Sequence, residues 1–416
     1  MKTYLVGGSV RDRLLGLPAS DRDYVVVGAT PGQMIAAGFQ SVGKDFPVFL
    51  HPRTKEEYAL ARTERKSGRG YTGFAFHAAP DVTLEDDLRR RDLTINAMAM
   101  DEHGALIDPY GGARDIAAKT LRHVSEAFAE DPLRVLRLAR FAARFTAFSV
   151  APETMALCRQ LVDDGEIGEL VAERVWQELS RGLMEAQPSR MFEVLRGSGA
   201  LAVLSPELDR LWGVPQKAIY HPEIDTGIHI MQVIDYAAHR GWPLATRYAA
   251  LTHDLGKGLT PKDILPAHHA HEARSAKLVD ALSARWRVQR DVAELARAVA
   301  AEHGNLGKLK DMRPATVHDV LMRCDAIRRP ERFVQMLDAC EADKSSRRAA
   351  GLPESAGEPF TARVDAMTAL AAMQSVDAGA IAAQLTAAGK PERIAAEVRE
   401  ARIAAIRAVR GDGALI

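Results

Sequence analysis

Residues 4–27 read YLVGGSVRDRLLGLPASDRDYVVV, and this stretch decides the fold. An apolar run ends at the glycine pair 7–8, a helix-like segment follows from Ser9, and a second apolar run opens with Asp21 and Asp23 on either side of an arginine. Side chains of a strand alternate between its faces, so we expect the two aspartates to point the same way. The order predicts a strand, a glycine turn, a helix and a second strand that begins with paired carboxylates.

Paired carboxylates beside a glycine turn indicate phosphate chemistry. Hard oxygen ligands at this spacing suit Mg²⁺, which proteins commonly share with substrate phosphates. Gly8 permits a close backbone approach, Ser9 is placed to cap the helix, and the amides at a helix start attract a triphosphate. Arg11 lies in the first helical turn, where its guanidinium can grip a phosphate. The combination predicts a two-metal phosphoryl-transfer site.

The length and composition of the chain restrict the class of protein to which it can belong. A chain of 416 residues is too long for one ordinary core, so we expect two to four structural units. Lys+Arg and Asp+Glu both number 55, which excludes a global cationic field for nucleic acid. Any nucleic-acid partner must therefore be held by local patches. The three cysteines have neither metal-binding nor redox spacing and fit a reduced cytosolic protein.

The pattern of the chain changes at about residue 116. Before it, short β-rich runs alternate with short helical segments, which predicts an α+β or α/β unit. After it the strand signal disappears, and the rest of the chain is expected to be essentially all α. No apolar run approaches ~18 residues and no signal peptide is recognisable, which predicts a cytoplasmic protein without a membrane partner.

Two further motifs lead to a known family. RRRDLTINAMAM stands at 89–100 and EDPLRVLRLARFAARF at 130–145. With the opening stretch, they resemble the nucleotidyltransferase superfamily of DNA polymerase beta, and specifically the bacterial class II tRNA CCA-adding enzymes, in the gammaproteobacterial form that carries an HD domain. The resemblance covers most of the chain.

The resemblance implies an α+β fold class. It has a polymerase-beta-like nucleotidyltransferase head with a small mixed sheet and helices, followed by an all-α neck, an HD domain and a helical tail. The expected domains are the head at 1–115, the neck with a nucleotide-selecting helix at 116–220, the HD phosphohydrolase domain at 221–345 and the tail at 346–416.

The same resemblance assigns residues of the head. Asp21 and Asp23 would hold the catalytic Mg²⁺ ions. The incoming nucleotide would be bound by Gly8, Arg11, Arg91, Arg137 and Arg140. A third carboxylate usually completes such a metal site from a neighbouring strand. The run EEYALARTERK offers Glu57 as the first choice and Glu64 as the second, and the sequence does not separate them.

The segment EDPLRVLRLAR suggests how bases are chosen without a template. Cytosine and adenine both present an amino donor beside an unprotonated ring nitrogen, whereas uracil and guanine present the reverse order. A carboxylate and a guanidinium can therefore mimic a pairing partner, and the resemblance gives this role to Asp131 and Arg134. The alternative for Asp131, which precedes Pro132, is a helix cap. Leu133, Leu136 and Phe141 are expected to face the core.

Neighbouring polar residues have less specific assignments. Asp92 and Asn96, one helical turn apart, are placed to position the sugar or the nucleotide-selecting helix. For Arg89 and Arg90 we favour a solvated cationic face. Lys66, Arg69 and the arginines of the C-terminal tail are candidates for the tRNA surface by charge alone.

A second chemical centre lies in the helical part. Of the 13 histidines, seven fall between 221 and 271. His229, the pair His253-Asp254 in THDLGKG and the later Asp343 resemble the HD phosphohydrolase superfamily. Histidine and carboxylate ligands from separate helices can hold a divalent transition metal. Lys257 and the HHAH run at 268–271 are candidates to neutralise a phosphate.

In the CCA-adding family, the HD domain is linked with 2′,3′-cyclic phosphodiesterase, 2′-nucleotidase and phosphatase activity, favoured by nickel, Ni²⁺. Single histidines in helices are more often structural than ligands, and four others are assigned that default: His221, His239, His303 and His318.

The sequence therefore predicts a template-independent enzyme that builds or repairs the 3′ CCA end of tRNA from CTP and ATP, as a monomer or homodimer. One alternative is a bacterial poly(A) polymerase, which shares the head. The other is an HD metal phosphohydrolase whose head only binds nucleotides.

Overall fold

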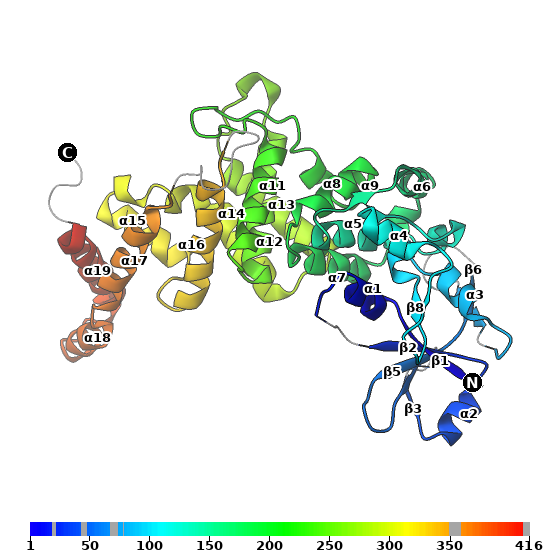
Figure 1. The fold of residues 1–416 in the computed structure, drawn as a ribbon. Coiled ribbons are helices and arrows are strands. Elements are labelled where there is room, and N and C mark those ends of the chain that lie inside the picture. Colours follow the sequence, from blue (N-terminus) through cyan, green and yellow to red (C-terminus); the bar gives the residue numbers. More distant parts are fainter. Residues whose placement is uncertain (19–21, 43–47, 67–73, 78, 349–358, 411–416) are drawn as a thin grey trace. The chain divides into compact units, whose positions relative to one another are not determined.

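The computed structural model describes residues 1–416 except 19–21, 43–47, 67–73, 78, 349–358 and 411–416, and it omits the side chains of 64–66 and 74–77 (Figure 1). Asp21 and Arg69 lie outside the described residues, as do the side chains of Glu64 and Lys66. The chain forms two compact units, Met1–Leu204 and Ser205–Ile416.

The first unit contains a seven-stranded mixed sheet with strand order β3-β4-β5-β2-β1-β8-β9. Its strands are β1 (Lys2–Val6), β2 (Asp23–Val27), β3 (Gln40–Val42), β4 (Val48–Leu50), β5 (Glu57–Leu60), β8 (Ala99–Met100) and β9 (Leu106–Ile107). Only β2 and β5 pair in parallel within this sheet; its other neighbouring strands are antiparallel. The separate hairpin-like pair is β6 (Thr63–Lys66) with β7 (Phe74–His77).

Helices of the first unit follow and surround these strands. The α-helices are α1 (Gly8–Leu14), α2 (Pro31–Ala36), α3 (Leu84–Arg89), α4 (Gly112–Ala117), α5 (Leu133–Arg144), α6 (Pro152–Asp163), α7 (Ala172–Leu183), α8 (Ser189–Gly197) and α9 (Ala200–Leu204). The 3₁₀ turns are η2 (Thr94–Asn96), η3 (Glu126–Glu130) and η4 (Glu166–Glu169). Helix α5 packs against α7 and α8, which brings its arginines beside the polar face of α7.

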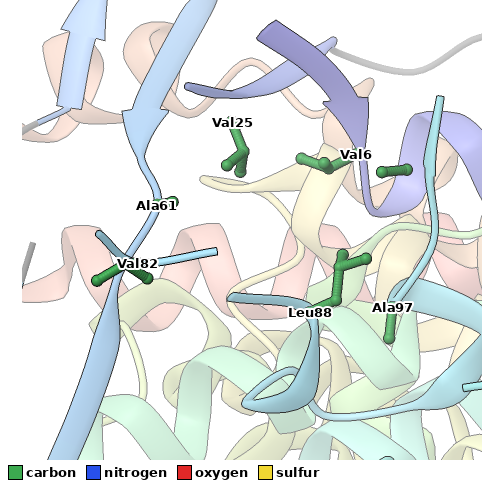
Figure 2. Packing of buried hydrophobic residues seen from close by; sticks show 7 residues of the cluster. Val6, Val25, Ala61, Val82, Leu88 and Ala97 are labelled. Atoms are coloured by element: carbon green, nitrogen blue, oxygen red, sulfur yellow. The ribbon is translucent and has the colours of Figure 1, made fainter. Parts of the chain in front are cut away.

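A small hydrophobic cluster fixes the strands that position the site. Val6 and Val25, from the adjacent strands β1 and β2, pack with Leu88 of α3 and with Ala97 (Figure 2). Val6 and Leu88 are almost completely buried. Burial of this apolar surface holds the end of β1, and therefore the turn that follows, in one place relative to β2.

The second unit is helical throughout its described residues. Its α-helices are α10 (Pro206–Asp209), α11 (Thr226–His239), α12 (Leu244–Thr252), α13 (His271–Arg285), α14 (Arg290–Leu306), α15 (Pro314–Arg323), α16 (Pro330–Ser345), α17 (Ala362–Gln374), α18 (Ala378–Ala387) and α19 (Ile394–Arg410). The 3₁₀ turns are η5 (Leu255–Leu259), η6 (Lys262–Ile264), η7 (Leu309–Asp311) and η9 (Pro391–Arg393). The tail helix α19 packs against α15 and α17 and buries Ile403 and Ile406.

The α+β fold class with an all-α continuation is confirmed, with three local corrections. Strands do occur beyond residue 116, because β10 (Thr120–Leu121) and β11 (Ser149–Val150) form a two-residue parallel pair too short to leave a periodic signal. Helix α1 begins one residue earlier than expected. Ser9 does not cap it, because Ser9 is already inside the helix and Gly7 occupies the N-cap.

One stretch is more apolar than expected. Ala362–Ala387 is long and apolar enough to cross a membrane by length and composition alone, since an 18-residue window within it has a mean hydropathy of 1.2. The segment contains no uninterrupted apolar run of ~18 residues, because Arg363, Asp365 and Asp377 lie within it. Its backbone is divided into α17 and α18, and α17 buries Leu370 and Met373. Core helices of soluble proteins meet the same test of length and composition.

Candidate functional site

Asp23 and Glu57 are direct partners in the parallel ladder between β2 and β5. Partner residues of adjacent strands lie on the same face of a sheet, so both carboxylates face one side, and both are exposed. Asp23 is also the partner of Val6, the last residue of β1. The register therefore places two of the expected metal ligands beside the turn that starts at Gly7. Glu64 belongs to the separate β6–β7 pair.

The backbone geometry of this turn requires glycine. Gly7 has φ of 70°, in the left-handed region that favours glycine. A Cβ atom at Gly7 would lie 2.8 Å from Nη1 of Arg91, and one at Gly8 would lie 3.3 Å from Nη2 of Arg11. The turn thus lets two guanidinium groups approach the backbone closely.

These residues line one open cavity of about 730 Å³. It gathers the metal-binding and nucleotide-binding residues predicted for the head and neck that the structure describes: Gly8, Arg11, Asp23, Glu57, Arg91, Asp131, Arg134, Arg137 and Arg140. Arginines dominate its polar lining, and the two carboxylates of β2 and β5 lie on its wall. A strongly cationic cavity that also contains adjacent carboxylates suits a polyphosphate accompanied by a divalent cation.

Buried carboxylates hold two of the arginines in place. Asp92 accepts from Nε of Arg137 at 3.0 Å and from Nδ2 of Asn96 at 2.9 Å. Glu178 of α7 lies 2.8 Å from Nε of Arg140 and 3.7 Å from Nη1 of Arg137. Burial alone raises the pKa of Asp92, but the charge of Arg137 and the Asn96 hydrogen bond outweigh it and hold that pKa well below its usual value. Asp92 and Asn96 therefore support the arginines of α5.

Arg11 is held just as firmly. It is 3% exposed, and it donates through Nε to Asp12 at 2.8 Å and through Nη1 to Asn96 at 2.6 Å. Its guanidinium carbon lies 5.3 Å from the ring centre of Phe141 and 5.1 Å from that of Phe145. Desolvation by burial lowers the pKa of Arg11, although the neighbouring Asp12 opposes the shift. Such a fixed cation presents a preorganised partner to an anion.

Asp131 has two structural roles at the start of α5. Its Oδ1 accepts from the backbone N–H of Leu133 at 3.1 Å, as in the helix-cap alternative, and its Oδ2 pairs with Nη2 of Arg174 at 3.0 Å. Arg134 donates from its two Nη atoms to the carbonyls of Ala127 and Arg90, at 2.6 and 2.7 Å. Both side chains line the cavity in fixed orientations.

Helix α7 contributes residues that the sequence reasoning missed. Arg174, Gln177, Glu178 and Arg181 all line the cavity. Their spacing of three, four and seven residues places them on one helical face, and this pattern was available in the sequence. The expectation of a solvated Arg90 is wrong, because its side chain is only 17% exposed, lies 3.6 Å from Asp87 and lines the same cavity. Arg89 is exposed as expected.

The second unit brings the four predicted HD residues together. Nε2 of His229 lies 3.1 Å from Oδ1 of Asp343 and 4.0 Å from Oδ2 of Asp254. Nε2 of His253 lies 3.2 Å from the same Asp254 oxygen and 3.7 Å from the same Asp343 oxygen. The four come from α11, the end of α12 and α16, so residues far apart in the sequence form one cluster.

The cluster has the donor set of a metal site. Nε2 of His253 and Oδ1 of Asp254 are buried without a hydrogen-bond partner, an arrangement that costs free energy unless a cation or water satisfies it. His253 is oriented through Nδ1 by the carbonyl of Ala250 at 2.8 Å, and Nδ1 of His229 lies 2.8 Å from a carboxylate oxygen of Glu223. This is how metal-binding imidazoles are usually fixed. The residues therefore fit a divalent transition metal.

The charges around the cluster are strongly coupled. Burial alone lowers the pKa of His253, but Asp254 and Asp343 raise it to about 10. Burial alone raises the pKa values of Asp254 and Asp343, yet Lys257, Arg347 and the histidines hold them well below their usual range. Nζ of Lys257 lies 2.7 Å from Asp254, and Nη2 of Arg347 lies 2.6 Å from Asp343. The two buried carboxylates are therefore held in their ionised form, in which they can bind a cation.

Sequence families match along most of the chain. The family described as the poly A polymerase head domain matches residues 3–122, and the one described as a probable RNA and SrmB-binding site of polymerase A matches 147–211. The HD domain family matches 226–343. The fold and sites thus define a transferase of the nucleotidyltransferase class whose head is followed by an HD domain.

Curated relatives identify the family. A multifunctional CCA protein of Aromatoleum aromaticum is 61% identical over 409 residues, covering 98% of each chain. One from Cupriavidus pinatubonensis is 61% identical over 414 residues, again covering 98% of each chain. The chain belongs to the multifunctional CCA protein family of CCA tRNA nucleotidyltransferases.

Solved structures share the fold. A CCA-adding enzyme from Bacillus stearothermophilus in complex with CTP has a TM-score of 0.61 at 24% identity, covering 95% of this chain and 87% of that one. A Thermotoga maritima CCA-adding enzyme complexed with tRNA has a TM-score of 0.58 at 20% identity, covering 98% and 92%. The fold of the whole chain is therefore that of CCA-adding enzymes.

Proposed function

We propose that this protein completes and repairs the 3′-terminal CCA of tRNA, adding nucleotides from CTP and ATP without a nucleic-acid template. The observation that carries the proposal is the arginine-lined cavity in which Asp23 and Glu57 stand side by side. Relatives named multifunctional CCA proteins, at 61% identity over nearly the whole chain, support the substrate assignment.

The residues of the head and neck have separate roles in this reaction. Asp23 and Glu57, with Asp21, would hold Mg²⁺, which when bound activates the attacking hydroxyl and stabilises charge on the departing pyrophosphate. Gly8, Arg11, Arg91, Arg137 and Arg140 bind and orient the triphosphate. The tRNA 3′ oxygen forms a bond to the α-phosphorus while the bond to pyrophosphate breaks, and the arginines offset the phosphate charge throughout.

Asp131 and Arg134 select the base. The carboxylate accepts from the exocyclic amino group of cytosine or adenine, and the guanidinium donates to the adjacent ring nitrogen. Uracil and guanine would place a carbonyl against the carboxylate and an N–H against the guanidinium. Arg174, at 3.0 Å from Asp131, orients this carboxylate at the cavity wall.

The HD unit is proposed to hydrolyse phosphate esters, with 2′,3′-cyclic phosphodiesterase, 2′-nucleotidase and phosphatase activity. His229, His253, Asp254 and Asp343 would hold Ni²⁺ or another divalent transition metal. Buried atoms without hydrogen-bond partners support this assignment. Lys257 and His268 line the adjacent cavity and would meet the substrate phosphate.

The remaining assignments complete the proposal. The domains are a head at 1–115, a neck at 116–220, an HD domain at 221–345 and a tail at 346–416. The protein acts in the cytoplasm on tRNA as a monomer or homodimer, away from membranes. Lys66, Arg69 and the arginines of α19 are candidates for the surface that contacts tRNA.

A product-length assay tests the proposal. Purified protein is incubated with tRNA that lacks its CCA end, labelled CTP and ATP, and Mg²⁺. We expect a product that is three nucleotides longer and extension that then stops. Continued addition of A would instead identify a poly(A) polymerase, and no incorporation with intact phosphatase activity would identify an HD hydrolase with a nucleotide-binding head.

A further inference from the structure

Gln216 lies in the wall of the cavity that adjoins the HD cluster. The residue is 4% exposed and lines this cavity, which has a volume of about 620 Å³. Its backbone N–H donates to the carbonyl of Ile224 at 2.7 Å. The carbonyl of the same peptide group, that of Pro215, lies 3.0 Å from Nε2 of His268. Both polar atoms of this peptide group therefore have partners, which fixes the backbone from which the Gln216 side chain extends.

Lys257 fixes the orientation of the Gln216 amide group. Nζ of Lys257 lies 2.5 Å from Oε1 of Gln216 and 2.7 Å from Oδ2 of Asp254. An ammonium group can only donate hydrogen bonds, so the amide atom that faces it is the oxygen. The amide nitrogen, which is bonded to the same carbon, is therefore the atom that remains for another partner.

The amide nitrogen is a buried donor that lacks an acceptor. Among the residues that the structure describes, none accepts a hydrogen bond from Nε2 of Gln216. Leaving a buried donor unpaired costs free energy. Because the side chain lines a cavity, an oxygen atom of a ligand bound there would remove this cost. The ligand must present an acceptor, since an amide NH₂ group can only donate.

The neighbouring charges indicate which acceptor this is. Lys257, Lys308 and Arg347 line the same cavity, so an anionic ligand is favoured there. Asp254 and Gln216 use two of the three N–H groups of Lys257, and the third can donate to a ligand. A neutral donor and a cationic donor therefore lie side by side, joined through the amide oxygen of Gln216. Two adjacent donors match two oxygens of one phosphate group.

We propose that Gln216 is a substrate-binding residue of the HD unit. Its Nε2 donates to a non-bridging oxygen of the phosphate ester, while Lys257 donates to a second oxygen of the same phosphate group. The inference rests on the phosphohydrolase function proposed above. An amide neither gains nor loses a proton near neutral pH, so Gln216 binds and orients the substrate and takes no part in acid–base chemistry.

Two substitutions of similar size separate this role from a purely structural one. Gln216→Glu keeps an oxygen for Lys257 but replaces the amide donors with a second carboxylate oxygen, which repels phosphate. Gln216→Met removes both the acceptor and the donors and adds no charge. If the amide donates to the substrate, the glutamate variant is the more damaging of the two. If Gln216 only accepts from Lys257, glutamate is tolerated and methionine is damaging.

Steady-state hydrolysis of adenosine 2′-monophosphate by the full-length protein loaded with Ni²⁺ provides the first test. We expect KM to rise by about 10-fold or more in Gln216→Glu and by a smaller factor in Gln216→Met, with kcat within about 3-fold of the unsubstituted protein in both. Gln384→Glu, at an exposed glutamine of α18 in the same unit, is the matched control and should change neither constant. An unchanged KM in Gln216→Glu would overturn the inference.

A binding measurement provides a second test that does not depend on turnover. The Ni²⁺-loaded protein, freed of excess metal, is titrated with inorganic phosphate by isothermal titration calorimetry. Phosphate bound by arginines of the head should contribute equally in every variant, because Gln216 belongs to the other compact unit. We expect the affinity of the remaining site to fall by about 10-fold in Gln216→Glu and to stay unchanged in Gln384→Glu.

The outcomes distinguish the inference from the function on which it rests. Equal phosphate binding by the unsubstituted protein and Gln216→Glu would overturn the inference, whether or not the protein hydrolyses the ester. Weaker phosphate binding in Gln216→Glu, together with no hydrolysis by the unsubstituted protein, would overturn the proposed hydrolase activity and support the role of Gln216 in holding phosphate.

Discussion

Asp23 and Glu57 face the same side of the sheet as direct partners in its only parallel strand pair. Glu64, the other carboxylate considered for this role, belongs to a different pair of strands, β6 and β7. Asp23 also neighbours the end of β1, and the glycine turn follows at once. The carboxylates proposed to hold a cation and the arginines proposed to bind a triphosphate therefore line one cavity.

Removing the charge of Glu178 should weaken the binding of both nucleotides alike. Glu178→Gln deprives Arg140 and Arg137 of a buried anionic partner. We expect the KM for CTP and ATP to rise together by about 10-fold, equivalent to ~1.4 kcal/mol, without a change in base preference. Steady-state kinetics measure this effect. Glu193→Gln is the matched control, because Glu193 pairs with Arg190 but is 55% exposed. A selective effect on one nucleotide would contradict the positioning role.

Asp131→Ala should relax base choice. Loss of the carboxylate removes the group that disfavours a carbonyl at the base edge, at a cost of roughly 1–3 kcal/mol per mismatched group. Incorporation of UTP relative to CTP should rise, while total activity falls because the helix cap is also lost. Competition between labelled CTP and UTP measures the ratio. Arg137→Ala, in contrast, should raise KM for all nucleotides. An unchanged ratio in Asp131→Ala would reduce Asp131 to a cap.

Acid should remove the stabilisation that Asp92 provides. Its pKa in the folded protein lies below the usual value of 3.8, so the unfolded state binds more protons as the pH falls. The stabilisation is fully present above about pH 4 and is lost as the pH drops toward the folded pKa. We expect Asp92→Asn to cost about 3 kcal/mol at pH 7, because Arg137 loses a buried anionic partner.

Denaturant unfolding from pH 7 to pH 3 measures the difference between Asp92→Asn and the unsubstituted protein. That difference should narrow below pH 4. Asp81→Asn, at an exposed carboxylate, serves as the control. A difference that stays constant over the whole range would mean that ionised Asp92 is not what stabilises this region.

The two centres should be separable, because their residues belong to different compact units. His253→Ala should lower hydrolysis of 2′,3′-cyclic AMP by at least about 100-fold and leave CMP incorporation into tRNA unchanged. Asp23→Asn should lower CMP incorporation into tRNA and leave hydrolysis of 2′,3′-cyclic AMP unchanged. His103→Ala should change neither activity. Loss of both activities from one substitution in a folded protein would indicate a single shared site.

Local patterns were sufficient to predict the opening of the fold. Two apolar runs around a glycine pair predicted β1, the turn and β2, because strand alternation and the conformational freedom of glycine act over a few residues. The three-residue spacing from Asp131 to Arg140 predicted a helix whose polar side meets the site, and Leu133, Leu136 and Phe141 are buried as expected.

Features that depend on packing between distant elements could not be predicted from the sequence. The choice between Glu57 and Glu64 depends on which strand pairs with β2, and strand partners are not encoded locally. Arg174 and Glu178 reach the cavity because α7 packs on α5. His303, expected to be structural, faces His271 only because α13 packs against α14. Arg90 looked solvated in the sequence, yet the fold turns it into the cavity.

Single-turnover incorporation of labelled CMP into tRNA lacking its CCA end most directly tests the claim that Asp23 and Glu57 form the catalytic pair of the head. The assay compares Asp23→Asn, Glu57→Gln and Glu64→Gln in folded protein. We predict that the first two substitutions each slow incorporation by about 100-fold or more, and that Glu64→Gln stays within a few-fold of the unsubstituted protein. Full activity in Glu57→Gln, with loss of activity in Glu64→Gln, would contradict the account.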